Sequence, residues 1–217
     1  MRKVQFVEGE YYHVFNRGVD KRTVFQDAQD FDRFLLSLVD FNSVEPIGSI
    51  YEYSFQKKPQ LGNLVSKPKK KEKKPLVELV AYCLKKNHFH FIFKQTAERG
   101  IEKLMHRLGL GFTKYFNLRH KRSGSLFQGT FKAVHIESNE QLIHLSAYVN
   151  LNNMVHDFSG NDFRSSWNEY IGKINKGMCA KDMIIEQFKN VKGYKKMVEQ
   201  TVREIKNRRD MENLILE

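Results

Sequence analysis

The stretch 76–94, LVELVAYCLKKNHFHFIFK, decides the fold class of this chain. Leu76–Leu84 and His88–Lys94 are rich in the aliphatic and aromatic residues that strands favour, and Lys85–His88 holds the turn between them. Two neighbouring strands joined by a tight turn pair in the antiparallel direction. The sequence therefore predicts a β-hairpin in the middle of the chain.

Further helices and strands surround the predicted hairpin. From hydrophobic periodicity and turn residues we predict a strand at 10–18, a helix at 27–42, a helix at 101–117, strand material at 125–136 and a helix from 138 to about 155. This order, with its central hairpin, predicts the α+β class, in which a small, mostly antiparallel sheet has helices packed on one face.

Capping and helix-breaking residues refine the helices. Asp27 is a predicted N-cap, and Ser138 forms a capping box with Gln141, three positions further on. Gly109 and Gly111 weaken the middle of the helix at 101–117, so we expect a kink or break there.

The composition indicates one soluble domain with an appendage. Of the 217 residues, 41% are hydrophobic and 29% are charged. No window approaches the ~20 apolar residues that cross a bilayer, and Cys83 and Cys179 are too few for a disulfide framework or a cysteine-rich zinc site. We predict a domain at 1–158, a helical C-terminal appendage at 159–217 and, since no apolar leader is visible, a cytoplasmic location.

The charge is concentrated in one segment. Residues 57–75 hold eight Lys, one Glu and three of the four prolines, which leaves +5 of the net charge of +12 for the rest of the chain. We interpret 57–75 as a flexible surface insertion, either without function or acting as an electrostatic tether for phosphate backbones. The net charge points towards a polyanion such as nucleic acid but does not establish one.

The second strand of the hairpin carries a histidine pair. Alternate side chains of a strand share a face, so His88, His90 and Ile92 point one way and the phenylalanines between them point towards the core. Two histidines at this spacing, with Cα atoms roughly 7 Å apart, can converge on one divalent ion. They are otherwise half-exposed strand histidines, because a metal site needs a further ligand from another element.

The helix at 138–155 offers the missing groups. In steps of four, His144, Tyr148 and Asn152 lie on one face. Beside them runs an apolar stripe that would pack on the sheet: Ile143, Ala147, Leu151 and Met154. The phenolic oxygen of Tyr148 is a possible nucleophile and the amide oxygen of Asn152 a possible metal ligand. Alternatively, Tyr148 packs at the helix edge and Asn152 belongs to the helix end.

This combination resembles the single-tyrosine HUH transposases, and within them the REP-associated tyrosine transposases. Five segments match in the family's order: a first strand with an Asn-Arg-Gly turn at Tyr12–Gly18, the HUH motif at His88–His90 preceded by Asn87, the segment before the tyrosine helix at Ser123–Gly129 with Phe131–Ala133, the nucleophile motif at Tyr148–Asn152, and a downstream motif at Phe163–Tyr170. Lys86 and Asn153 replace prolines that are common in the family, and neither change removes a reacting group.

The resemblance implies a ferredoxin-like HUH fold and metal-dependent cleavage and strand transfer of single-stranded DNA. Tyr148 would attack a backbone phosphorus to form a 5′-phosphotyrosine bond, and a 3′-hydroxyl would later rejoin the strands. His88, His90 and Asn152 would hold Mg²⁺ or Mn²⁺ next to the scissile phosphate. The expected partner is single-stranded DNA with hairpins and not a membrane, and the chain would act as a homodimer or a monomer.

Basic and aromatic residues outside this set are candidate DNA contacts, because cations bind phosphates and rings stack on bases. The candidates are Arg17, Lys103, Arg107, Lys114, Tyr115, Arg119, Lys121, Arg122 and Lys132, with Phe116 as a further stacking residue. Each is alternatively part of an ordinary solvated surface. Tyr115 is also the main rival nucleophile, although it has Arg119 where the motif requires Asn.

Two other functions compete with the enzyme. A hairpin-binding protein or repressor on the same fold would bind DNA equally well with or without metal. A replication or mobilisation relaxase would share the active-site type, but the small size and the lack of a P-loop disfavour it. The intact set of His88, His90, Tyr148 and Asn152 favours the enzyme.

Overall fold

The computed structural model describes residues 4–47, 74–151, 163–174 and 177–215, and its centre is a five-stranded sheet. All neighbouring strands pair antiparallel, in the order β4-β1-β3-β2-β5. The strands are β1 (Tyr11–Arg17), β2 (Val77–Lys85), β3 (His88–Gln95), β4 (Lys132–Ile136) and β5 (Phe163–Ser165). The predicted hairpin is confirmed as β2–β3, in which Lys85 pairs with His88 across the turn.

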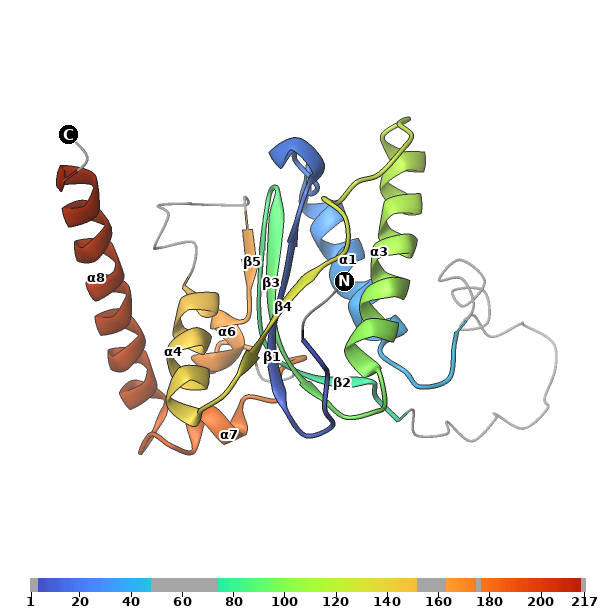
Figure 1. Ribbon diagram of the computed structural model, residues 1–217. Helices are drawn as coiled ribbons and strands as arrows, with labels where there is room; N and C mark the ends of the chain where they lie inside the picture. The colour runs from blue at the N-terminus through green and yellow to red at the C-terminus, as the bar shows by residue number, and fades with distance from the viewer. Residues whose placement is uncertain (1–3, 48–73, 152–162, 175–176, 216–217) are drawn as a thin grey trace.

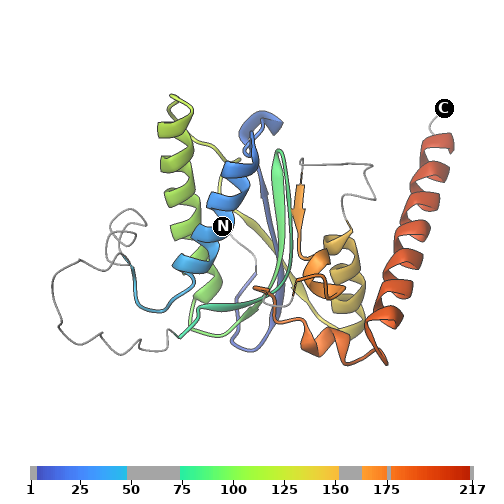
Figure 2. The same cartoon turned by 180° about the vertical axis from the view of Figure 1, so that it is seen from behind.

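Helices lie on both sides of this sheet. They are the 3-10 helix η1 (Val19–Lys21), α1 (Ala28–Phe41), α3 (Gly100–Arg119), α4 (Asn139–Asn150), α6 (Trp167–Tyr170), α7 (Asp182–Ile185) and α8 (Val191–Ile215). Figure 1 shows the sheet nearly edge-on, with α1 and α3 on one side and α4, α6 and α8 on the other. The view from behind in Figure 2 shows the same two layers of helices. The α+β class and the antiparallel sheet are therefore confirmed.

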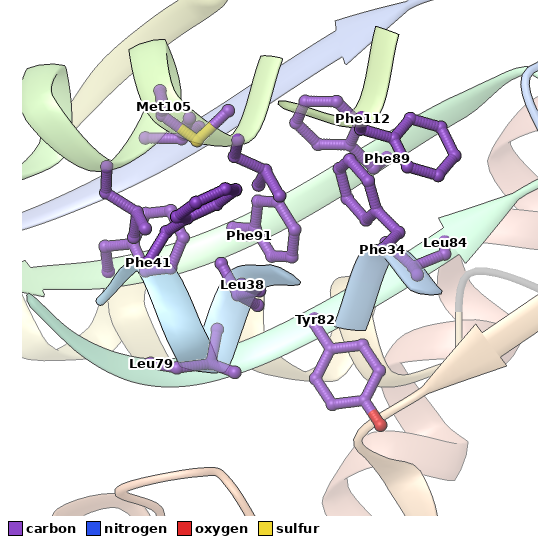
Figure 3. Close-up of a cluster of buried hydrophobic side chains, with 14 of the residues drawn as sticks. Phe34, Leu38, Phe41, Leu79, Tyr82, Leu84, Phe89, Phe91, Met105 and Phe112 are labelled. Carbon is purple, nitrogen blue, oxygen red and sulfur yellow. The ribbon is translucent and has the colours of Figure 1, made fainter. Parts of the chain in front are cut away.

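The prediction that the helices pack on one face is wrong, because the central strand β2 is apolar on both faces. Leu79, Tyr82 and Leu84 point into a first core, which Figure 3 shows together with side chains of α1 and α3. Val80 and Cys83 belong to a second core on the other face, built with residues of α4 and α8. A strand buried on both faces needs cover on both, as in sheets enclosed by helices.

The first core also explains how β3 is oriented. Its residues Phe89, Phe91 and Phe93 are at most 2% exposed and lie against α1 and α3, where Phe34 and Phe112 meet edge to face with ring centroids 4.8 Å apart. Burial of this aromatic face turns the alternate residues of β3 towards α4. The predicted core-facing phenylalanines are thus confirmed, and the histidines lie on the opposite face.

Helix α3 runs unbroken from Gly100 to Arg119, so the predicted break at its glycines is not found. A Cβ atom on Gly111 would lie 2.8 Å from Cε2 of the Phe41 ring, whereas one on Gly109 would meet nothing within 4 Å. Phe41 is 6% exposed and packed in the first core. Gly111 therefore allows α3 to approach α1 closely. Gly109 has no such packing role and only lowers the helix propensity of α3.

These two glycines provide a matched pair of substitutions. Gly111→Ala is expected to lower the free energy of unfolding by about 1 kcal/mol or more, because overpacking a core costs about 1–3 kcal/mol and outweighs the gain in helix propensity. Gly109→Ala should raise the same free energy by about 0.5–1 kcal/mol. Urea unfolding followed by circular dichroism checks both values, and a stabilised Gly111→Ala protein would contradict the close α1–α3 packing.

The C-terminal segment takes part in the sheet and in the second core. Strand β5, which the prediction of a purely helical appendage did not include, pairs with β2 through Cys83↔Ser165. Tyr170 and Tyr194 are fully buried against the residues of α4. The boundary between 1–158 and 159–217 stays a prediction, and the Lys-rich segment 57–75 lies, apart from its last two residues, outside the described part of the chain.

Candidate active site

One face of the sheet, turned towards α4, gathers polar side chains from two neighbouring strands. In the register of β1 and β3, Phe15 lies opposite His90 and Arg17 lies opposite His88. Directly opposed residues of an antiparallel pair share a face, so His13, two positions before Phe15, also belongs to it. The histidine pair thus has a third histidine beside it, from a strand separated by more than 70 positions in the sequence.

The two histidines of β3 lie close together, and the residue before them orients the first one. The rings of His88 and His90 have centroids 5.2 Å apart and stand nearly perpendicular, at 88°. Oδ1 of Asn87 lies 2.6 Å from Nδ1 of His88, and Nδ2 of Asn87 donates to the carbonyl of Lys21 at 3.2 Å. An amide oxygen only accepts, so Nδ1 of His88 carries the proton in this bond.

His13 contacts the second histidine of the pair. Its Nε2 atom lies 3.0 Å from Nδ1 of His90. The Phe15 ring lies beside both imidazoles. Its centroid is 4.9 Å from that of the His13 ring and 5.8 Å from that of the His90 ring. Burial lowers the pKa of His13 to about 4, so this imidazole is neutral at physiological pH. His13 lies within the matching segment Tyr12–Gly18, but no pattern in the sequence connects it to His90.

Tyr148 lies against this cluster within the same chain. Its half-buried ring has its centroid 6.0 Å from that of His90, and the two planes meet at 85°. Helix α4 presents it after an N-cap at Ser138, whose side chain accepts from the N–H of Gln141 at 3.1 Å, as predicted. The sequence left open whether the tyrosine meets the histidines of its own subunit, and in this structure it does.

The helix that carries Tyr148 is shorter than predicted. It ends at Asn150, not near Val155, and the predicted metal ligand Asn152 lies outside the described residues. His144 is exposed and Ile143 only half-buried, so the buried side is rotated from the predicted apolar stripe. The buried residues of α4 include two polar ones, and they are Leu142, Ser146, Ala147, Val149 and Asn150.

A buried polar network explains this rotation. The Tyr194 hydroxyl of α8 lies 3.0 Å from Oγ of Ser146 and accepts from Nδ2 of Asn150 at 2.9 Å. Oγ of Ser166 donates to Oδ1 of Asn150 at 2.5 Å and accepts from the N–H of Tyr82 in β2 at 2.9 Å. Polar groups turn inward here because each finds a partner. The C-terminal segment therefore fixes the orientation of the helix that carries Tyr148.

The rival tyrosines lie elsewhere. Tyr115 belongs to α3, on the opposite face of the sheet, and its hydroxyl donates to Oδ1 of Asp30 at 3.2 Å. Burial and the nearby carboxylate raise the pKa of Tyr115. Tyr170 is buried, with its hydroxyl donating to the carbonyl of Val80 at 2.9 Å. Of these three tyrosines, Tyr148 is therefore the one that the fold brings to the histidines.

Six of the predicted DNA contacts are engaged within the protein, and two of these, Arg17 and Lys103, donate to Oε1 of Gln128 and to the carbonyl of Glu98 while staying exposed. Arg119 forms ion pairs of 2.6 Å with both Asp27 and Asp30, and its hydrogen bond lowers the pKa of Asp27 to about 2. Arg107 donates to the carbonyl of Ser43 at 2.5 Å, near the end of α1. Arg122 donates to the Asn117 amide oxygen at 2.7 Å, while Tyr115 binds Asp30 as above. These residues have structural roles, and their DNA contacts stay predictions.

Five of the candidates are exposed, and one is buried. Phe116 is only 1% exposed and belongs to the first core, so it is not available for base stacking. The exposed candidates are Arg17, Lys103, Lys114, Lys121 and Lys132. Arg17 and Lys132 lie on the face of the histidine pair, since they are opposite His88 and Phe15 in the strand registers. Their cations are the ones best placed for a phosphate beside the site.

Besides His13, Lys85 is a residue of this face that the sequence did not indicate. Lys85 is 2% exposed and lies directly opposite His88 on the neighbouring strand. No sequence pattern distinguishes it from the other lysines of the turn, because its burial follows from the cover of both faces of β2. Cys83, opposite His90, is fully buried, and burial raises the pKa of its thiol to about 12, which keeps it protonated.

The described residues limit which ligands a metal could have at this site. Within the described ranges, no three His, Cys, Asp or Glu side chains are grouped so as to hold a metal ion. A metal at the histidine pair would therefore need a ligand of another type, such as an amide oxygen or water. Over the same ranges, none of the helices combines the length and the hydrophobicity needed to cross a bilayer.

Comparisons with known proteins find a family model that matches part of the chain and a solved structure of similar fold. Residues 49–152 match the family model described as "Transposase IS200 like", a span that includes His88, His90, Tyr148 and Asn152. The fold is similar to that of a REP-associated tyrosine transposase solved bound to a REP hairpin, with a TM-score of 0.52, 10% identity, and coverage of 80% of this chain and 86% of that one. No curated protein matches the sequence. Through residues 49–152, the chain is thus similar to the IS200-like transposases.

Proposed function

We propose that this protein cleaves and rejoins single-stranded DNA beside hairpins through a covalent bond between Tyr148 and a 5′-phosphate. The observation that carries the proposal is the contact between the Tyr148 ring and His90 in one chain, with ring centroids 6.0 Å apart. A nucleophile and a possible metal ligand from elements distant in the sequence thus share one face of the sheet. The same contact supports a site completed within one subunit, so that a monomer suffices.

The histidines fit a divalent ion, and we propose Mg²⁺ or Mn²⁺ held by His88, His90 and Asn152. Nδ1 of each histidine is engaged by a neighbour, at 2.6 Å from Asn87 and at 3.0 Å from His13, so the metal would bind Nε2 of each ring. This arrangement is usual for metal-binding histidines. When bound, the ion would polarise the scissile phosphate and offset the charge that develops on it.

The reaction would proceed by exchange of phosphoesters. The phenolic oxygen of Tyr148 would lose its proton and form a bond to phosphorus, while the bond from phosphorus to the 3′ oxygen breaks and that oxygen takes up a proton. Attack by a 3′-hydroxyl on the phosphotyrosine would reverse these steps and release the phenol. Arg17 and Lys132, both exposed on this face, would hold neighbouring phosphates in position.

Hairpin DNA is the proposed substrate because the structural neighbour was solved with a REP hairpin. The net charge of +12 favours a polyanion, and the exposed cations Lys103, Lys114 and Lys121 of α3 and the following turn offer contacts away from the reacting phosphate. Binding should therefore weaken with salt, as for any complex that rests on phosphate contacts.

A covalent adduct is the direct test. Purified protein is incubated with single-stranded hairpin DNA from beside its own gene, with Mg²⁺ or Mn²⁺, and then denatured. We expect a protein–DNA adduct that survives denaturation, that maps by peptide mass spectrometry to Tyr148, and that is lost on chelation of the metal. Hairpin binding of equal strength with and without metal, with no adduct, would instead indicate a binding protein or repressor.

A further inference from the structure

We propose that Asn87 and His13 are positioning residues that hold His88 and His90 in the tautomer and orientation needed to bind a metal through Nε2. The inference rests on the proposed metal site, and it assigns roles to two residues that the family match and the reaction leave without one. Both contacts are direct hydrogen bonds to the pair.

The orientation of Asn87 is determined by its second contact. Its amide nitrogen donates to the carbonyl of Lys21 at 3.2 Å, which leaves the amide oxygen facing His88. That oxygen, 2.6 Å from Nδ1, can accept but not donate. His88 must therefore carry a proton on Nδ1, and in the neutral ring the lone pair is on Nε2.

His13 does for His90 what Asn87 does for His88. The two rings have centroids 5.2 Å apart and planes only 17° from parallel, while the bonded nitrogens are 3.0 Å apart. The centroid separation exceeds the nitrogen separation by about two ring radii, so both nitrogens lie close to the line between the ring centres. The rings therefore meet edge to edge, in the plane that contains the N–H bond and the lone pair.

One proton is shared in this contact, and its position decides whether His90 can bind a metal. If Nε2 of His13 donated, Nδ1 of His90 would be the acceptor and its Nε2 would carry the proton in the neutral ring, which blocks coordination. If Nε2 of His13 accepts, His90 carries its proton on Nδ1 and presents a lone pair on Nε2. We infer the second arrangement, because it gives both histidines the same tautomer and the same metal-binding atom.

The surroundings keep these partners in place. Asn87 is held by the turn at Lys21, which belongs to η1. His13 lies in the middle of β1, paired with Ile92, and the Phe15 ring packs beside it. Neither partner depends on α4, so the pair would be oriented independently of Tyr148. Loss of such partners typically lowers metal affinity 10- to 100-fold.

Metal affinity and tautomers are measured separately, on the full-length protein without DNA. Calorimetric titration with Mn²⁺ is expected to show about 10- to 100-fold weaker binding for His13→Ala and for Asn87→Ala. His13→Gln should recover most of the affinity, because its amide oxygen reaches the position of Nε2. His135→Ala, a histidine on the opposite face of β4 that contacts Glu10, should leave affinity unchanged.

Nitrogen-15 NMR of the metal-free protein reads the tautomers directly. We expect Nδ1–H and unprotonated Nε2 for both His88 and His90, and loss of this preference at His90 in His13→Ala. Protonated Nε2 at His90 in the wild-type protein, or Mn²⁺ affinity in both alanine variants within twofold of wild type, would overturn the inference. Tight Mn²⁺ binding without any DNA adduct would overturn the proposed function and leave the inference standing.

Discussion

A Tyr148→Phe protein is expected to form no covalent adduct with hairpin DNA while binding the hairpin as tightly as the wild type. The substitution removes one oxygen from a half-buried ring that packs 6.0 Å from His90, so the fold and the DNA-binding surface stay intact. Removal of an enzyme's nucleophile typically costs about 10⁴-fold or more in rate. Single-turnover cleavage on denaturing gels and a separate hairpin-binding titration measure the two effects.

Tyr115→Phe is the matched control for this experiment. Tyr115 lies in α3 on the far side of the sheet, where its hydroxyl contacts Asp30. This variant should form the adduct at the wild-type rate, although loss of the hydrogen bond will slightly lower its stability. An adduct that persists in Tyr148→Phe and disappears in Tyr115→Phe would reassign the nucleophile.

Asp30→Ala is expected to lower the free energy of unfolding by about 1–3 kcal/mol, the range for leaving buried hydrogen-bond donors without their acceptor. Asp30 is fully buried and accepts four hydrogen bonds. The donors are the N–H of Gln26 at 2.9 Å, Tyr115 at 3.2 Å, Arg119 at 2.6 Å and His120 at 3.0 Å. Its loss leaves the N–H of Gln26, Tyr115 and His120 without this acceptor, whereas Arg119 keeps its ion pair with Asp27.

Asp32→Ala, two positions further along α1, is the control. Its carboxylate is 72% exposed, and its ion pair with Arg164 is long, at 3.9 Å. Exposed pairs contribute about 0–1 kcal/mol, so this variant should unfold nearly as the wild type does. Unfolding in urea compares the two. An Asp30→Ala protein of unchanged stability but weakened hairpin binding would show that this cluster serves DNA contact and not the fold.

Much of the local structure follows from short-range rules that act within a few residues. Asp27 and Ser138 cap their helices, because an oxygen on either side chain reaches the N–H three residues on. His88 and His90 share a face because a strand alternates with period two. The five matching segments also place the histidine pair and the tyrosine in the correct order, which is how the family could be named from the sequence.

The same rules fail where the answer depends on a neighbouring helix that is distant in the sequence. Gly111 resembles a helix breaker in the sequence, yet it serves the close approach of Phe41. Arg119 resembles a phosphate contact, yet it neutralises Asp30 from 89 positions away. The helix of Tyr148 turns Ser146 and Asn150 inward because Tyr194, more than 40 positions further on, supplies their partner.

The sequence alone thus determined the hairpin and the starts of the helices at Asp27 and Ser138, since these depend on neighbours along the chain, and it supplied the prediction of the reacting residues. The tertiary structure decided that Tyr148 meets the histidines of its own subunit, that helices cover both faces, and that His13 contacts His90 from 77 positions away. The physical reason is the register between β1 and β3. It places side chains of two distant strands next to each other on one face of the sheet, which no local sequence pattern predicts.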